Sequence, residues 1–157
     1  MKKIILSSIM LIGLAFTTQA QDISKNALGL RIGDNSGLGA EISYQKALSG
    51  NNRLELDLGW RNSKDVDAFK LAGIYQWVWN IDGAFNWYAG AGAGIGSYSA
   101  NDINGTFAYI AGDIGIEYGF EEAPILISLD FRPEIGGHGY YENNYGSDIA
   151  LGLRYKF

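Results

Sequence analysis

Cysteine is absent from the 157 residues, so no disulfide can support the fold and no lipid-anchored cysteine can follow the N-terminal apolar run. The chain also lacks a basic run, and its formal net charge is −5. Both features argue against nucleic acid as a partner. After the N-terminal run, no apolar stretch reaches the roughly 20 residues that a membrane-spanning helix needs. If the mature chain crosses a membrane, it must do so with strands.

The N-terminus has the three parts of a secretory signal. Two lysines precede an apolar run from Ile4 to Phe16, and a small-x-small cleavage site ends at Ala20. The apolar run is too short to be a transmembrane anchor. We expect residues 1–20 to be a cleaved signal peptide and residues 21–157 to be one mature domain, with a formal charge of about −7 because two lysines are lost.

From Asn26 onward, apolar residues recur at every second position, which is the period of a β-strand. The clearest segment has leucine at positions 54, 56 and 58 and polar residues between them. Turn signals separate eight such segments, which predicts an all-β fold: an eight-stranded antiparallel up-and-down β-barrel. The predicted strands cover residues 28–32, 38–45, 53–61, 68–79, 85–96, 108–120, 125–132 and 148–157. Polar loops are expected at Ser97 to Thr106 and, as the longest, at Pro133 to Ser147.

Side-chain volume indicates which face of the barrel is apolar. An eight-stranded barrel has an interior just wide enough for side chains to fill, yet the apolar set supplies four or five large residues per strand, including all four tryptophans. These residues cannot all fit inside, so we expect them to face lipid in a transmembrane barrel. Aromatic residues near the strand ends would form headgroup-level girdles. They are Trp60, Trp77, Trp79, Phe85, Trp87, Tyr118, Phe120, Tyr155 and Phe157.

The opposite face is rich in small residues and in charges of both signs, which suits a narrow polar lumen. Seven cations and seven anions are expected there, so the lumen is predicted to be a neutralised ion-pair network. The cations are Arg31, Arg53, Arg61, Lys70, Arg132, Arg154 and Lys156, and the anions are Glu41, Glu55, Asp57, Asp113, Glu117, Asp130 and Asp148. Alternate glycines from Gly90 to Gly96 predict a glycine row that lets side chains of the opposite wall cross the barrel.

The C-terminal segment resembles the last-strand signal that outer-membrane barrels present to their assembly machinery. Gly152, Tyr155 and Phe157 match that pattern, whereas Leu151 stands where the signal usually has a polar residue. Together with the segment Leu129 to Pro133, the mature chain resembles the OmpA/OmpX-like family of small outer-membrane β-barrels. This resemblance implies location in the bacterial outer membrane, contact with its lipid, and delivery to the assembly machinery through the three matching residues.

The sequence contains no recognisable catalytic, cofactor-binding or metal-ligating motif, and we expect a monomer without cofactors that is not an enzyme. His138 lies in the longest predicted loop near Glu142, Ser147 and Asp148, which would suit a lipid-modifying site, but the spacing matches no known catalytic arrangement. We therefore expect a solvated loop histidine. The favoured function is a structural or surface-interaction barrel with a plugged lumen. The alternatives are a narrow porin-like channel for ions or small solutes and a lipid-modifying enzyme.

Overall fold

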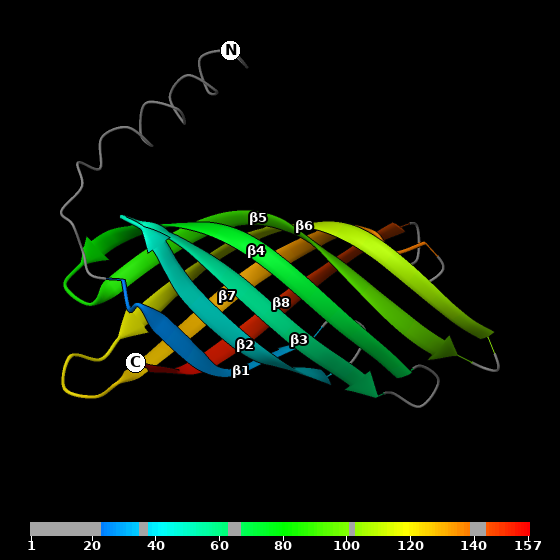
Figure 1. Ribbon diagram of the computed structural model, residues 1–157, viewed down its shortest axis with the longest axis horizontal. Helices are drawn as coiled ribbons and strands as arrows, with labels where there is room; N and C mark the ends of the chain where they lie inside the picture. The colour runs from blue at the N-terminus through cyan, green and yellow to red at the C-terminus, as the bar shows by residue number, and fades with distance from the viewer. Residues whose placement is uncertain (1–22, 35–37, 63–66, 101–102, 139–143) are drawn as a thin grey trace, which may run out of the picture.

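The computed structural model describes residues 23–34, 38–62, 67–100, 103–138 and 144–157, all but a few of which belong to strands. The predicted signal peptide lies outside the described residues. The strands are β1 (Asn26–Asp34), β2 (Leu38–Ser49), β3 (Asn52–Asn62), β4 (Asp67–Asp82), β5 (Phe85–Ala100), β6 (Ile103–Gly119), β7 (Ile125–Gly136) and β8 (Tyr145–Lys156). Figure 1 shows them as one cylinder of tilted, antiparallel strands.

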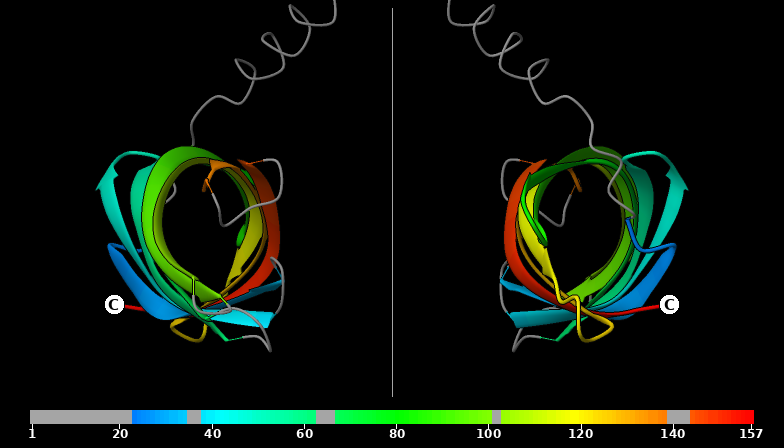
Figure 2. Two further views of the ribbon diagram at one scale, coloured as in Figure 1. Left: turned by 90° about the vertical axis from the view of Figure 1, so that its right-hand side faces the viewer. Right: turned by 90° about the vertical axis from the view of Figure 1, so that its left-hand side faces the viewer.

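Each strand pairs with the next in the chain, and β1 pairs with β8 to close the ring seen in Figure 2. The closure continues to the C-terminus, where the Asn26 amide donates to the Phe157 carbonyl over 3.1 Å. Gly50 and Gly83 form tight turns with φ of 51°, a backbone conformation that glycine adopts without strain. The eight-stranded antiparallel barrel predicted from the sequence is therefore confirmed.

Large apolar side chains cover the outside of the cylinder. Leu58 and Ile127, which a water-soluble barrel would place centrally, expose 37% and 40% of their surface. The same holds for Trp60, Trp77, Phe85, Tyr118, Phe120, Tyr155 and Phe157. Such an apolar belt over a charged interior has the polarity of a barrel that sits in lipid, so the predicted orientation of the faces is confirmed. No helix among the described residues is long and apolar enough to cross a membrane.

Most of the outward aromatic side chains lie at one end of the barrel, here called the termini end, where β1 begins and β8 finishes. Trp79 and Trp87 stack there with ring centroids 4.4 Å apart, and Tyr155 and Phe157 lie 6.5 Å apart on the last strand. Trp60 lies near the opposite end of the barrel. The aromatic residues therefore occupy strand ends, as a headgroup-level girdle requires.

Two predicted loops are wrong, because the strands extend through them. β5 runs to Ala100 and β6 begins at Ile103, so most of the predicted Ser97 to Thr106 loop is a paired hairpin. Its outward residues are polar because the hairpin extends past the apolar belt, and this polarity makes the segment resemble a loop in the sequence. β7 likewise continues through Pro133 to Gly136, and β8 starts at Tyr145.

The predicted seventh strand ends at residue 132, just before Pro133, and proline has no N–H to donate to a ladder. In the structure, the pairing of β6 with β7 is interrupted at Pro133, while Pro133 still pairs with Ser147 of β8. The proline therefore occupies a position where its missing donor is not needed. The same correction moves Glu134 from a loop to the inner face of β7, where it is 2% exposed.

Candidate functional site: the barrel interior

The barrel interior is lined by every second residue of each strand, and this alternation brings together charges from every strand except β5, which has none. Thirteen charged side chains are buried there. The cations are Arg31, Arg53, Lys70, Arg132 and Arg154, and the anions are Glu41, Glu55, Asp57, Asp113, Glu117, Asp130, Glu134 and Asp148. Four of the five cations are at most 1% exposed, so the guanidinium groups fill the lumen instead of lining a water-filled pore.

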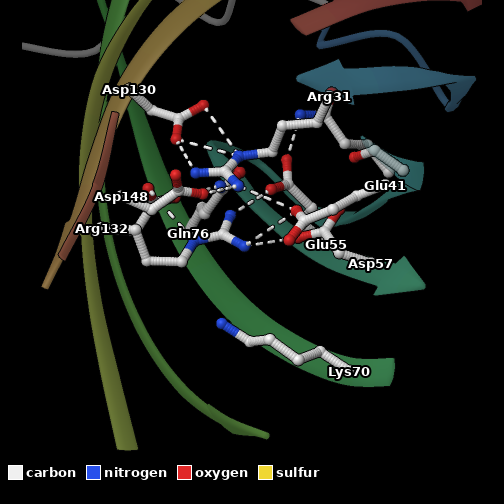
Figure 3. A network of polar contacts seen from close by, with 12 residues as sticks. Arg31, Glu41, Glu55, Asp57, Lys70, Gln76, Asp130, Arg132 and Asp148 are labelled. Atoms are coloured by element: carbon white, nitrogen blue, oxygen red, sulfur yellow. Dashed lines mark hydrogen bonds and ion pairs between the residues drawn. The ribbon is translucent and has the colours of Figure 1, made fainter. Parts of the chain in front are cut away.

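Arg31 of β1 holds together one side of the interior (Figure 3). Its Nη1 donates to Glu41 over 2.8 Å and to Asp148 over 2.7 Å. Its Nε donates to Asp130 over 3.0 Å, and its Nη2 also pairs with Asp130. One guanidinium thereby joins carboxylates of β2, β7 and β8, because a planar fork of five donors can serve several acceptors at once.

Arg132 of β7 reaches across the lumen to the opposite wall. Its two Nη atoms donate to Asp57 and Glu55 of β3, each over 2.7 Å. Glu55 also accepts from Arg154 of β8 over 3.1 Å. Because β3 and β7 lie on opposite sides of an eight-stranded ring, these ion pairs block the central axis.

Two further cations pair above and below this centre. Arg53 Nη1 donates to Glu117 over 2.6 Å, and the guanidinium lies 4.7 Å from the centroid of the Tyr88 ring. Lys70 donates to both oxygens of Glu134, over 2.7 and 2.6 Å, and its ammonium lies 4.7 Å from the Tyr109 ring centroid. Each cation therefore has a carboxylate on one side and an aromatic face on another, an arrangement that favours a desolvated charge.

An apolar cluster fills the interior towards the end opposite the termini. It consists of Ala72, Ile74, Phe107, Tyr109 and Ala111, with Tyr98 packed against it. The rings of Tyr109 and Phe107 occupy the space beside Gly94 and Gly96, the glycines paired with them on β5. A Cβ at Gly94 would lie 2.3 Å from Tyr109, and one at Gly96 would lie 2.5 Å from Phe107. The predicted glycine row is therefore real, and it provides space for aromatic rings as well as for ions.

The predicted balance of seven cations and seven anions is wrong for the described residues, where five buried cations face eight buried carboxylates. Glu134 is absent from the predicted set because the predicted strand ends before Pro133, whereas β7 continues to Gly136. Lys156 is only partly buried and donates to the Phe120 carbonyl at the termini end. The Arg61 side chain lies outside the described residues. Among the described side chains, buried carboxyl groups therefore outnumber buried cations.

The bridging contacts of two interior glutamines were not predicted, although their place on the polar face was. Gln76 accepts from Arg53 Nε and donates to Asp113, and Gln45 donates to Glu55 over 2.6 Å. Their inward positions follow from the strand period, but their role in bridging charges depends on which strands lie opposite, which a single sequence does not give. Five buried polar atoms have no hydrogen-bond partner among the described residues: Arg53 Nη2, Asp57 Oδ1, Asp113 Oδ1, Arg132 Nε and Asp148 Oδ1.

Two hollows reach into this interior. One, of about 90 Å³, lies at the termini end beside Arg53 and Lys156. The other, of about 10 Å³, lies beside Glu41 and Lys70. Between them, Arg31, Ser43 and Gln76 are 0% exposed. Buried polar side chains therefore separate the two hollows in the described part of the barrel.

The remaining candidate residues do not form a site. His138 is exposed just after β7, Ser147 lies on β8 opposite Pro133, and Glu142 lies outside the described residues. No hydrogen bond joins His138 to Ser147 in the described chain. The described ranges also contain no group of three or more histidine, aspartate or glutamate side chains placed to hold a metal ion.

The residues of the assembly signal lie on β8 or, for Phe157, directly after it. Tyr155 and Phe157 are 58% and 61% exposed on the lipid face, whereas Gly152 is buried, and a Cβ there would lie 2.3 Å from the Ser128 hydroxyl. The glycine of this pattern therefore makes room for the lumen network, while the aromatic pair faces outward.

No protein-family model and no curated protein sequence matches the chain. Several solved structures share its fold. The N-terminal β-barrel domain of Pseudomonas aeruginosa OprF superposes with a TM-score of 0.69 and 14% identity, covering 85% of this chain and 98% of that one. Neisserial surface protein A gives 0.63 and 14%, covering 84% and 94%. The attachment invasion locus protein Ail of Yersinia pestis gives 0.54 and 15%, covering 85% and 97%.

These similarities cover nearly the whole of each compared barrel, and at such low identity they concern the fold. The closed ring, the outward apolar belt and the charged interior agree with them. The protein therefore has the fold of the small eight-stranded outer-membrane β-barrels, as its resemblance to the OmpA/OmpX-like barrels predicted.

Proposed function

We propose that the protein is an outer-membrane barrel with a structural or surface-interaction role, and that its lumen is closed to ions and solutes. The observation that carries this proposal is the charge network at mid-height, where Arg132 bridges to the opposite wall and Arg31 is 0% exposed. A porin lumen is filled with water, whereas this one is filled by side chains.

The network is better explained as a plug than as a source of stability. Replacing a buried ion pair by well-packed apolar residues is often neutral or stabilising, so burial of thirteen charges is weak evidence for a stability role. In a membrane barrel, however, an apolar interior would reverse the polarity that distinguishes lumen from lipid face. Paired charges fill the lumen while keeping it polar.

Export and assembly complete the proposal. Residues 1–20 would direct the chain across the inner membrane and be removed. The exposed rings of Tyr155 and Phe157, with Gly152, would be presented to the assembly machinery, and the apolar belt would then contact outer-membrane lipid. We propose a monomer, and we assign no catalytic role to His138 or to any other residue.

Planar-bilayer recording tests the closed lumen. Purified mature protein, checked for folding by its faster gel migration before boiling, is expected to give no steady single-channel current. A variant that removes one cross-lumen bridge, Arg132→Ala with Asp57→Ala, is expected to conduct. Its current should be cation-selective in a salt gradient, because buried carboxylates still outnumber buried cations.

The matched control is Phe131→Ala with Leu58→Ala, which changes the neighbouring outward residues of the same two strands. This control is expected to stay silent, because neither side chain enters the lumen. A steady open-pore current from the unaltered protein would contradict the proposal and favour the narrow channel instead.

A further inference from the structure

A groove of about 820 Å³ lies on the outer face of the barrel and crosses β3 to β7. Gly73 of β4 and Ala93 of β5 pair with each other in it, and Gly73 also pairs with Leu56 near the middle of β3. A Cβ at Gly73 would lie 3.5 Å from Leu56 Cδ2, so the space outside the glycine is open. The groove is therefore a hollow at mid-height in a belt that large side chains otherwise cover.

The groove continues towards the end of the barrel opposite the termini, here called the hairpin end because the β5–β6 hairpin extends past the belt there. Ala108 of β6 pairs with Ile95 of β5, and a second hollow, of about 490 Å³, shares both residues and Leu71 with the first. This second hollow ends at Ser97 and Thr106, which pair with each other and are exposed. The groove is thus apolar at its deep end and has two hydroxyl groups at its shallow end.

The length of the groove matches one leaflet of a bilayer. Ala93 and Ser97 are four residues apart on β5. With about 3.3 Å per residue and a strand tilt of about 40°, they differ in height by roughly 10 Å. The apolar band of an outer-membrane barrel is about 25 Å tall, so half of it is about 12 Å. The groove therefore runs from the middle of the belt to its polar edge.

An empty groove in a lipid-facing wall is unfavourable, because its lining loses van der Waals contacts. Water does not suit the deep end, where the side chains offer it no hydrogen-bond partners. The convex wall of a neighbouring barrel would span the groove, whereas one acyl chain is narrow and flexible enough to lie in it. The head of such a chain would reach the Ser97 and Thr106 hydroxyls, which can donate to a carbonyl oxygen.

We propose that the groove holds one acyl chain of a lipid from the leaflet at the hairpin end, and that the carbonyl group of this chain accepts a hydrogen bond from Ser97 or Thr106. Lipid elsewhere on the belt meets large side chains, whereas this chain has contacts on both sides and below. The inference rests on the proposed placement of the barrel in a membrane. It does not depend on whether the lumen conducts, because the groove lies on the outer face.

Native mass spectrometry tests the groove. The mature protein is folded into vesicles of ester-linked dimyristoyl phosphatidylcholine, checked by its faster gel migration before boiling, and transferred to the gas phase from detergent. The unaltered barrel is expected to retain one lipid molecule. The ether-linked analogue of the same lipid has no carbonyl group at the head of its chains, and its retention should be up to roughly tenfold lower, as loss of one hydrogen bond predicts.

Ala93→Leu with Ala108→Leu fills the groove with side chains and should abolish lipid retention. The barrel should still fold, because both positions face lipid and remain apolar. Ala89→Leu is the matched control, since Ala89 faces outward on the same strand but lines neither hollow. This control should retain its lipid. Ser97→Ala with Thr106→Val should weaken retention of the ester-linked lipid to the level of the ether-linked one.

The proposal is overturned if the folded, unaltered barrel retains no lipid, or if the groove-filling pair and Ala89→Leu retain it equally. Equal retention of ester-linked and ether-linked lipid would overturn the carbonyl contact. A protein dimer that disappears in the groove-filling pair would identify a second copy as the occupant instead. Absence of the fast-migrating form in vesicles would contradict the membrane barrel itself, and with it the groove.

Discussion

Leu56 points outward near the middle of β3 and exposes 41% of its surface, whereas Leu48, 50% exposed, lies one residue from the end of β2. Both side chains are leucines on the outer surface of the barrel, but they lie at different heights along its axis. In lipid, the cost of a charge on the outer face depends on depth, because a charge near the interface can reach water. In water the two positions would be equivalent.

This difference gives a residue-scale prediction. Leu56→Arg is expected to lower the free energy of unfolding from lipid by about 2–4 kcal/mol, and Leu48→Arg by about 0–1 kcal/mol. Reversible urea unfolding in phospholipid vesicles measures both. Equal effects of the two substitutions would mean that the apolar belt does not lie in the bilayer as described.

At the residue scale the sequence predicts which face each side chain occupies, because the strand period is two and no slip occurs within the segments. What the sequence does not predict is the polarity of every inward side chain, although it predicts which side chains point inward. Ile74, Val78 and Leu126 are apolar and yet lie inside, at 0%, 3% and 5% exposure. Ile74 packs in the apolar cluster with Phe107 and Tyr109, a contact that the alternation of polar and apolar residues cannot reveal.

At the scale of elements, the seam between β1 and β8 is the contact that closes the barrel, and Gly29 lies in it opposite Arg154. A Cβ at Gly29 would lie 2.0 Å from the Leu153 carbonyl oxygen and 2.5 Å from the Arg154 Cα. Both atoms belong to the backbone of β8, so they cannot rotate away as a side-chain end would. The seam requires glycine at this position for close approach.

Gly29→Ala is therefore expected to destabilise the folded barrel by at least about 1–3 kcal/mol, the usual cost of overpacking, or to prevent its closure. Gly73→Ala is the control, since a Cβ there would meet only the Leu56 Cδ2 atom at an ordinary 3.5 Å. The fraction of protein that migrates as the compact form without boiling measures closure. Equal yields for both variants would show that the seam tolerates a side chain.

Strand number and order could be predicted from the sequence, but strand ends could not. The polar outward residues of the β5–β6 hairpin and the proline of β7 both resemble loop signals, although pairing with a neighbouring strand overrides them. The ion pairs of the lumen could not be predicted from the sequence. Arg132 and Glu55 are 77 residues apart in the chain and meet only because the ring places β7 opposite β3.

At the scale of the whole molecule, the two ends of the barrel differ. Tight turns at Gly50 and Gly83 and most of the outward aromatic residues occupy the termini end, while the β5–β6 hairpin extends past the apolar belt at the other. If the barrel sits in the outer membrane, the hairpin end should face the cell exterior and the termini end the periplasm.

The absence of cysteine makes this orientation directly testable, because a single introduced thiol is the only one present. Ile103→Cys, at the hairpin end and 65% exposed, should react with a membrane-impermeant maleimide on intact cells. Asp82→Cys, at the exposed last residue of β4 at the termini end, should react only after permeabilisation. The reverse pattern, or equal labelling before permeabilisation, would contradict the orientation or the location.

The Arg31 contacts can form only late in the assembly of the barrel. Its acceptors Asp130 and Asp148 follow it by 99 and 117 residues, so this guanidinium stays without two of its carboxylates until the last quarter of the chain has been added. A truncated or half-assembled chain would have to bring that uncompensated charge into the bilayer. Assembly should therefore be all-or-none, with unfinished chains held in the periplasm and exposed to its proteases.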